Sequence, residues 1–227
     1  MKIAREGWPL IALFAGLSAM AAAGALYWLG VWGWLVVGAG LLLTGWCVWF
    51  FRDPDRTTPD LPGSVISPAD GVVCQVADAP YPPELGGEGN VPRVCVFMNV
   101  FNVHVNRVPC AGTIEQLEYV KGSFVNASFD KASTHNERMA ISMKTRSGHR
   151  VAFVQIAGLV ARRIVCRLKL SQEVAAGERF GLIRFGSRVD VYLPKGSEIV
   201  VAVGQKTTAG ETLLARLPGA VVDKRGA

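Results

Sequence analysis

The chain has 227 residues, 50% of them hydrophobic, and a formal net charge of +6 at pH 7. This length allows one domain or two small ones, and the absence of a Lys/Arg-rich run or known binding motif argues against a nucleic-acid partner. The five cysteines are odd in number and include no Cys-x-x-Cys spacing, which excludes a disulfide framework and a zinc site as working hypotheses.

The first part of the chain is a long apolar stretch without charge, from Trp8 to Phe51. A single helix over this stretch would be about twice as long as the hydrocarbon core of a bilayer is thick. We therefore predict two transmembrane helices, at about 9–28 and 31–51. Tryptophans at the start, near the reversal and at the end fit the two interfaces of a membrane. A cleaved signal peptide would be far shorter and would not be followed by a second span.

Positive charges flank this apolar stretch on both sides. Lys2 and Arg5 precede it and Arg52 and Arg56 follow it, whereas the turn between the two expected spans has no charge. By the positive-inside rule both ends lie in the cytoplasm. The sequence thus predicts that residues 1–56 anchor the chain in the cell (inner) membrane and that the rest lies on its cytoplasmic face.

Residues 57–227 change to short β-branched runs separated by Gly, Pro and Asp. The short spacing of the turn signals favours a sandwich or barrel over βαβ units, so we predict a mostly β, compact domain of that kind. The segments "SPADGVVCQV" and "VGQKTTAGETLLARL" resemble the two halves of biotinyl and lipoyl carrier domains, but the modified-lysine motif of a carrier is missing. The expected strands are 71–76, 93–100, 112–120, 138–145, 150–158, 163–170, 179–185, 188–194 and 197–204.

Three polar residues of this domain are candidates for chemistry, and each also has a simple structural interpretation. Ser187 follows a glycine in "RFGSRVD", where Gly-Ser would also suit a two-residue hairpin turn. His104 lies in "FMNVFNVHVNRVP", and strand alternation places it beside Asn102 and Asn106 on a face that is either solvated or lines a cleft. Asp70 belongs to "SPADG", which is a strong turn signal. None of these patterns alone identifies a site.

The order of the motifs is more specific than any one of them. The segments "FFRDPDR", "SPADG", "NVFNVHVNRVPCAG", "NASFDKASTHNERM", "QIAGLVARRI" and "RFGSRVDVYLP" follow one another over most of 50–205. Taken together they resemble the phosphatidylserine decarboxylase proenzyme family in its short bacterial and archaeal form. The resemblance implies a chain that cleaves itself between Gly186 and Ser187 into chains 1–186 and 187–227 and converts the serine into a covalent pyruvoyl group.

The resemblance also implies roles for the three candidates. Ser187 would attack the preceding carbonyl and, as the pyruvoyl group, would form a Schiff base with the amine of phosphatidylserine. His104 would act as the base in cleavage and as the acid in decarboxylation to phosphatidylethanolamine, and Asp70 would orient the imidazole. Long-form relatives carry two histidines three residues apart here, but Arg107 stands at the second position. Either His104 serves both steps or another group, such as His135, replaces the missing one.

A tethered enzyme can reach a phospholipid substrate that stays in the bilayer. The loop 119–131 would contact lipid through Lys121, Phe124 and Asn126, although an ordinary surface loop fits its composition equally well. Arg162 and Arg163 could bind the lipid phosphate, but paired arginines more often face solvent.

The expected partners are the phospholipid and the chain's own cleaved fragment, with a homodimer as a further possibility and no metal. Two other functions fit parts of the sequence. A non-catalytic, membrane-anchored β module of the adaptor type would leave the chain intact, and the same chemistry on a soluble amino acid would not need the anchor.

Overall fold

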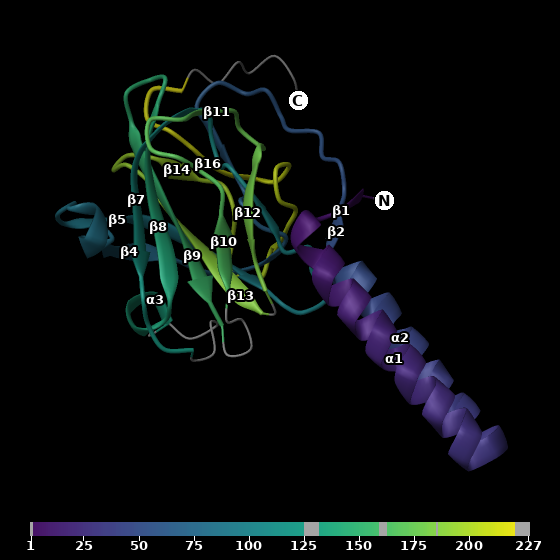
Figure 1. Ribbon diagram of the computed structural model, residues 1–227. Helices are drawn as coiled ribbons and strands as arrows, with labels where there is room; N and C mark the ends of the chain where they lie inside the picture. Colours follow the sequence, from purple (N-terminus) through teal and green to yellow (C-terminus); the bar gives the residue numbers. More distant parts are fainter. Residues whose placement is uncertain (1, 125–131, 159–162, 185, 221–227) are drawn as a thin grey trace. The chain divides into compact units, whose positions relative to one another are not determined.

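The computed structural model of the chain describes residues 2–124, 132–158, 163–184 and 186–220. They form two compact units, Met1–Asp55 and Arg56–Ala227, of which the first is helical and the second consists mostly of β-strands (Figure 1).

The first unit is one long apolar helical region that runs from Arg5 to Phe50. By its length and composition this region could cross a membrane. A short 3₁₀ turn at Gly30–Trp32 (η2) separates α1 (Trp8–Leu29) from α2 (Gly33–Phe50), and the region begins with a 3₁₀ turn at Arg5–Gly7 (η1). The strands at its two ends, β1 (Lys2–Ile3) and β2 (Arg52–Asp53), pair in an antiparallel manner. The expected number of membrane crossings stays a prediction.

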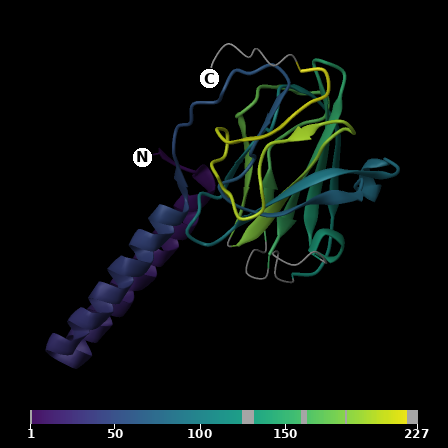
Figure 2. The same ribbon diagram turned by 180° about the vertical axis from the view of Figure 1, so that it is seen from behind.

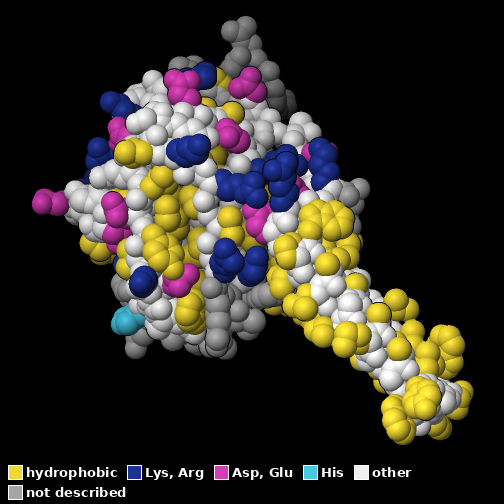
Figure 3. Space-filling view, in the orientation of Figure 1, with side chains coloured by type: hydrophobic (Ala, Val, Ile, Leu, Met, Phe, Trp, Pro, Cys, Tyr) yellow, Lys and Arg dark blue, Asp and Glu magenta, His cyan; other side chains and the backbone are white. Residues whose placement is uncertain are grey.

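Small residues let α1 and α2 approach each other closely. A Cβ atom on Gly40 would lie 2.8 Å from the Cβ of Ser18, and one on Gly33 would lie 2.6 Å from the backbone nitrogen of Leu26. The Ser18 hydroxyl donates to the Gly40 carbonyl at 3.4 Å. Close contact through small residues is typical of helices that pack without large interlocking side chains. The large apolar side chains point outward instead, and they cover most of this unit's surface in Figure 3.

The second unit is built on a curled, eight-stranded antiparallel sheet with the order β11-β7-β8-β9-β13-β5-β4-β15 (Figure 1). Its curvature gives it the form of a half-barrel, with β13 near the middle of the strand order. The strands are β4 (Gly71–Pro80), β5 (Asn90–Met98), β7 (Gly112–Val120), β8 (Arg138–Thr145), β9 (Arg150–Ala157), β11 (Glu173–Val174), β13 (Ser187–Tyr192) and β15 (Lys206–Thr207).

Two three-stranded sheets complete the unit, with the orders β10-β12-β6 and β14-β16-β3. The last part of the chain, yellow in Figure 2, supplies β14 and β16. These strands are β3 (Ser64–Ile66), β6 (Val105–Arg107), β10 (Ile164–Cys166), β12 (Arg179–Ile183), β14 (Glu198–Ile199) and β16 (Leu213–Arg216), and the short helices are η3 (Pro83–Leu85) and α3 (Ala132–His135).

The main core lies between the large sheet and the two smaller ones. It combines Val96 and Phe153 of the large sheet with Phe180 of β12 and Leu214 of β16. A second, smaller apolar cluster on the other face of the large sheet includes Val154 and Tyr192. The central strands are therefore buried on both faces, which explains why their sequences are apolar runs rather than simple alternations.

The expectation of a mostly β domain is confirmed, but the hairpin interpretation of "RFGSRVD" is wrong. The strands on either side of this segment do not pair with each other: β12 pairs with β10 and β6, whereas β13 pairs with β9 and β5. The Gly-Ser step therefore lies where the chain passes from one sheet into another. A tight two-residue turn would have required the two strands to be neighbours.

Candidate active site

The Gly186–Ser187 peptide lies where the connection from β12 enters β13. Gly186 has a φ of +70°, in the left-handed region that residues with a side chain rarely adopt. A Cβ atom at this position would meet no other atom within 4 Å. The backbone conformation at this position therefore favours glycine, although a side chain would have room.

Ser187 is the first residue of β13 and is completely buried. It pairs with Met98 of β5 on one side and with Ala157 of β9 on the other. Alternation along the strand places its side chain on the same face as Val189 and Val191, which belong to the main core. The hydroxyl oxygen lies 4.0 Å from the Met98 sulfur, a weak contact that leaves it little constrained.

The contacts of His104 define the tautomer of its imidazole. Nδ1 lies 2.9 Å from the Asn102 carbonyl oxygen, and because a carbonyl can only accept, Nδ1 carries the proton. Nε2 of the neutral ring is then an acceptor, and the backbone N–H of Gly186 points to it at 3.4 Å. The histidine is 2% exposed, so bulk water competes little for this lone pair. The structure thus brings a base to the peptide that the resemblance identifies as the cleavage site.

Two amide side chains complete the inner face of the site. Asn106 of β6 donates through Nδ2 to the Pro68 carbonyl at 3.5 Å and lies 3.6 Å from the Met98 sulfur. Gln155 of β9 donates through Nε2 to the Asn106 Oδ1 at 2.9 Å. Both side chains are fully buried. Sequence reasoning passed over Gln155; the signal was a lone amide inside the otherwise apolar strand "RVAFVQIAG".

Asp70 accepts a hydrogen bond at each of its two carboxylate oxygens. Its Oδ2 accepts from Arg56 at 2.8 Å, and its Oδ1 accepts from the backbone N–H of Ala209 at 2.7 Å. These bonds fix the carboxylate next to the "SPADG" turn. Its expected role in orienting His104 stays a prediction.

Arg107 stands at the position of the second long-form histidine, and its side chain contacts the loops at Gly177 and Gly210. Its Nη1 donates to the Gly177 carbonyl at 3.0 Å. The side chain also runs close to Gly210, where an added Cβ would lie 2.7 Å from the arginine Cδ. Arg107 therefore braces two loops of the β unit, and Asn106 is the residue of this strand that lies near Ser187 and Met98.

The outer face of β13 carries a buried ion network directly after Ser187. Arg188 makes two hydrogen bonds to the carboxylate of Asp190, at 2.7 and 3.0 Å, and both side chains are at most 1% exposed. The hydroxyl of Ser133, from α3, accepts from Arg188 and from Arg93. Burial is the largest single cause and acts to lower the pKa of Arg188, but the Asp190 carboxylate together with Cys95 and Cys74 outweighs it, so the pKa is raised and the guanidinium stays charged. This network fixes the residue that follows Ser187.

The thiol of Cys95 lies beside this network and remains neutral. Burial is the largest cause that raises its pKa, and the negative charge of Asp190 adds to the effect. A protonated, buried thiol is a poor nucleophile, so Cys95 does not compete with Ser187.

The predicted lipid-binding residues are only partly described. Lys121 and Arg163 are exposed, whereas Phe124 is half-buried and packs against the main core. His135 is exposed at the end of α3, and its carbonyl accepts from the backbone N–H and the hydroxyl of Ser123. Asn126 and Arg162 lie outside the described residues. Substrate-binding roles for this group stay predictions.

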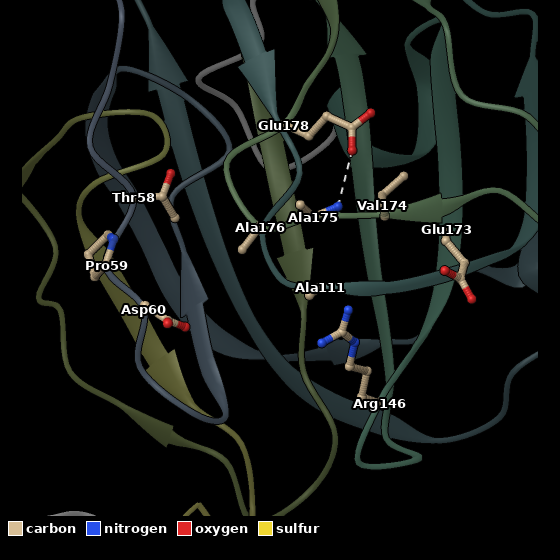
Figure 4. A pocket seen from close by; sticks show the side chains of 10 residues that line it. All are labelled: Thr58, Pro59, Asp60, Ala111, Arg146, Glu173, Val174, Ala175, Ala176 and Glu178. Atoms are coloured by element: carbon tan, nitrogen blue, oxygen red, sulfur yellow. Dashed lines mark hydrogen bonds between the residues drawn. The ribbon is translucent and has the colours of Figure 1, made fainter.

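A separate cavity lies elsewhere in the β unit. It has a volume of about 580 Å³ and is lined by polar and charged side chains that include Asp60, Arg146 and Glu173 (Figure 4). The cavity adjoins one end of the β7–β8 pair, where Gly112 pairs with Thr145. Ser187 lies level with the opposite end of this pair, near Arg138. None of the predicted site residues lines this cavity. Within the described ranges no group of three or more His, Cys, Asp or Glu side chains could hold a metal ion.

Comparison with known proteins agrees with the resemblance in the motifs. Residues 43–215 match the family model described as phosphatidylserine decarboxylase. A phosphatidylserine decarboxylase proenzyme of Paramagnetospirillum magneticum is 57% identical over 95% of this chain and 87% of its own length. The proenzyme of Cereibacter sphaeroides is 50% identical over 98% of this chain and 93% of its own, and that of Rickettsia bellii 50% over 94% and 89%. The chain belongs to the phosphatidylserine decarboxylase family.

Proposed function

We propose that this chain is a self-cleaving proenzyme that breaks the Gly186–Ser187 bond, and that the mature enzyme decarboxylates phosphatidylserine to phosphatidylethanolamine by means of a pyruvoyl group at position 187. The observation that carries the proposal is the approach of the His104 Nε2 lone pair to the Gly186 backbone N–H, beside the buried Ser187 hydroxyl.

In cleavage, His104 Nε2 takes the hydroxyl proton while Ser187 Oγ bonds to the Gly186 carbonyl carbon. The carbon–nitrogen bond then breaks, and the Ser187 nitrogen takes the proton back from the imidazolium, which leaves an ester. Removal of the Ser187 Cα proton expels the Gly186 carboxylate and leaves a dehydroalanine. Water then replaces its nitrogen, which departs as ammonia, and a ketone remains at the start of the small chain.

The left-handed backbone at Gly186 favours this reaction for a simple reason. The glycine adopts this conformation without strain, and the open space beside it leaves its carbonyl accessible to the neighbouring hydroxyl. The Met98 sulfur contact does not bind the hydroxyl firmly, so little has to be broken before it attacks.

The surroundings of residue 187 fit a pyruvoyl group. The position is dry and is bordered by Met98 and Ala157, with the polar groups of His104, Asn106 and Gln155 on the inner side. When present, the ketone supplies an electron sink for the carbanion that loss of carbon dioxide creates. His104 would donate the proton to that carbon, because its Nε2 faces the same place. Asp70 would support the imidazole.

The apolar helical region supports a membrane location. We infer that its two helices each span the inner membrane and that the β unit works on the cytoplasmic face. A lipid could then reach the site without leaving the bilayer completely. Lys121 and Arg163 are exposed cations suited to a lipid phosphate, and Asn126, His135 and Arg162 are further candidates. Association of two copies stays a prediction.

The test uses the full chain in detergent, on a denaturing gel and by intact mass. Wild-type protein should give two chains, with the small chain beginning with a pyruvoyl group, and should release carbon dioxide from phosphatidylserine. Ser187→Ala should remain a single chain, and His104→Gln should cleave at least about a hundredfold more slowly. Ser147→Ala and His149→Gln are matched controls away from the site and should cleave normally. An intact, unmodified wild-type chain would favour the non-catalytic adaptor module instead.

A further inference from the structure

We propose that the side-chain carbonyl of Gln155 binds the amine nitrogen of the substrate and places it next to residue 187. The inference rests on the proposed function, because it concerns a substrate with a primary amine. It assigns a role to the first residue of the "QIAGLVARRI" segment, for which the resemblance implied none.

The orientation of the Gln155 amide follows from a chain of hydrogen bonds that starts at the backbone. The Pro68 carbonyl can only accept, so the Asn106 NH₂ group faces it and the Asn106 Oδ1 faces Gln155. Gln155 must therefore present its own NH₂ group to Asn106, at 2.9 Å. Its Oε1 is consequently turned away from Asn106, and exchanging the nitrogen and oxygen atoms would set two acceptors against each other.

This carbonyl oxygen is an unused acceptor in a buried place. Oε1 of Gln155 is shielded from solvent and has no hydrogen-bond partner within the described part of the chain. A buried acceptor without a donor is costly to a folded protein, so a persistent one calls for an explanation. A donor that arrives with the substrate is such an explanation.

Gln155 lies on the same face of the large sheet as Ser187. Ser187 pairs with Ala157, two residues along β9 from Gln155, so the two side chains are diagonal neighbours on the same face of the sheet. Diagonal neighbours of this kind are within reach of a long side chain. The Met98 sulfur contacts both the Ser187 hydroxyl and the Asn106 amide, which places the Asn106–Gln155 pair immediately around position 187.

Of the groups in the substrate headgroup, the amine is the one that can bind to Gln155 Oε1. A serine phospholipid carries a phosphate, a carboxylate and an amine, and at neutral pH only the amine can donate a hydrogen bond. The Gln155 carbonyl would attract the amine and disfavour the two anions. It would therefore set which end of the headgroup meets residue 187 and would leave the carboxylate on another side.

The experiment separates self-cleavage from capture of the amine. Wild type, Gln155→Met and Gln155→Glu are purified as full chains, together with Gln116→Met as a control on an exposed glutamine of β7. Cleavage is followed on a denaturing gel. Capture is followed by adding a short-chain phosphatidylserine, reducing with cyanoborohydride at pH 6, and measuring the mass of the small chain. Decarboxylation kinetics on the same lipid are recorded alongside.

Gln155→Met removes the Nε2 bond to Asn106 together with Oε1, so its cleaved fraction is measured first and capture is expressed per cleaved chain. Its capture of lipid and its kcat/KM should fall about ten- to a hundredfold, as for loss of one hydrogen bond to a charged group. Gln155→Glu keeps an oxygen in place and in its neutral form donates to Asn106, so it should recover capture. Gln116→Met should match wild type in every measurement.

Several results would overturn the inference. Wild-type capture by a cleaved Gln155→Met chain would show that the carbonyl is not used. Equal loss of capture in the Met and Glu variants would indicate a role in packing alone. Should Gln155→Met fail to cleave, a cleaved Gln155→Glu chain that captures no lipid would likewise contradict a role for the carbonyl. If wild type itself gave no small chain or no mass increase, the proposed function would fail rather than the role of Gln155.

Discussion

At the scale of single residues, the site depends on which side-chain donors and acceptors already have hydrogen-bond partners and which acceptors remain available. The Asn102 carbonyl occupies Nδ1 of His104 and thereby leaves Nε2 as the acceptor that faces Gly186. The Pro68 carbonyl acts similarly on the Asn106–Gln155 pair. In both cases a backbone carbonyl, which cannot donate, determines which atom of a side chain is left as an acceptor.

The left-handed conformation of Gly186 gives a first prediction. Gly186→Ala has room for its methyl group but must adopt a φ of +70°, so in a Ser187→Ala background it should lower the free energy of unfolding by about 1–2 kcal/mol. In the background with Ser187 intact, cleavage should slow, because the strained alanine gives the attacking hydroxyl a less accessible carbonyl. Denaturant titration and a time course on gels measure the two effects.

Gly89 provides the control for this substitution. It has a φ of +78° and lies in the exposed loop before β5, and a Cβ atom added to it would also meet no other atom within 4 Å. Gly89→Ala should cost a similar amount of stability and leave cleavage unchanged. If both variants cleaved at the wild-type rate, the conformation of Gly186 would have no part in the reaction.

At the scale of elements, β13 combines two functions by alternation. On the face toward the main core, Ser187 is followed by Val189 and Val191. On the opposite face lies the Arg188–Asp190 pair. Because the strand pairs along its whole length with β5 and β9, neither face can shift without disturbing the other. A register slip of one residue would place Arg188 on the face toward the main core, where Ser187 now lies.

The buried ion pair gives a second prediction. Asp190→Asn would leave two buried guanidinium groups, those of Arg188 and Arg93, without their shared carboxylate. Breaking such a pair from one side costs about 3–5 kcal/mol, and the loss should appear in denaturant unfolding of the Ser187→Ala chain. The matched control is Glu198→Gln, which breaks an exposed pair with Arg216 and should cost at most about 1 kcal/mol. Equal costs for the two variants would contradict a stabilising role for the network.

The sequence predicted element types better than it predicted their partners. The apolar stretch and the β-branched runs identify helices and strands because they follow from local composition. The segment "RFGSRVD" looks like a hairpin for the same reason, yet β12 pairs with β10 and β6, and β13 pairs with β9 and β5. Gln155 was overlooked because one amide within a buried apolar run gives no periodic signal. Its meaning appears only when Asn106, from another sheet, is placed beside it.

At the scale of the whole molecule, the two units divide the work that a lipid enzyme requires. The helical unit exposes large apolar side chains such as Trp28, at 81%, which suit a hydrocarbon environment better than water. The β unit buries its polar chemistry between sheets, where the low dielectric strengthens each hydrogen bond. Under the proposed function, the first unit keeps the second close to a substrate that water does not dissolve.

Under the proposed function, the position of the Gly186–Ser187 bond predicts that the two chains remain together after this bond breaks. Chain 187–227 begins with β13, which is hydrogen-bonded to β5 and β9 of the other chain on its two sides, and continues with β14, β15 and β16. Its residues Val189, Val191 and Leu214 are fully buried in the shared core. Removing the small chain would therefore expose the middle of the large sheet and most of the core.

We expect the mature enzyme to run as a single species in native mass measurements in detergent, with both fragments present in equal amounts. The fragments should come apart only in the denaturant range in which the β signal in circular dichroism is lost, because separating them requires the core to unfold. Uncleaved Ser187→Ala provides the reference for size and for the unfolding curve. Release of the small chain at denaturant concentrations that leave the β signal intact would contradict the prediction, because β13 would then separate from β5 and β9 without unfolding of the core.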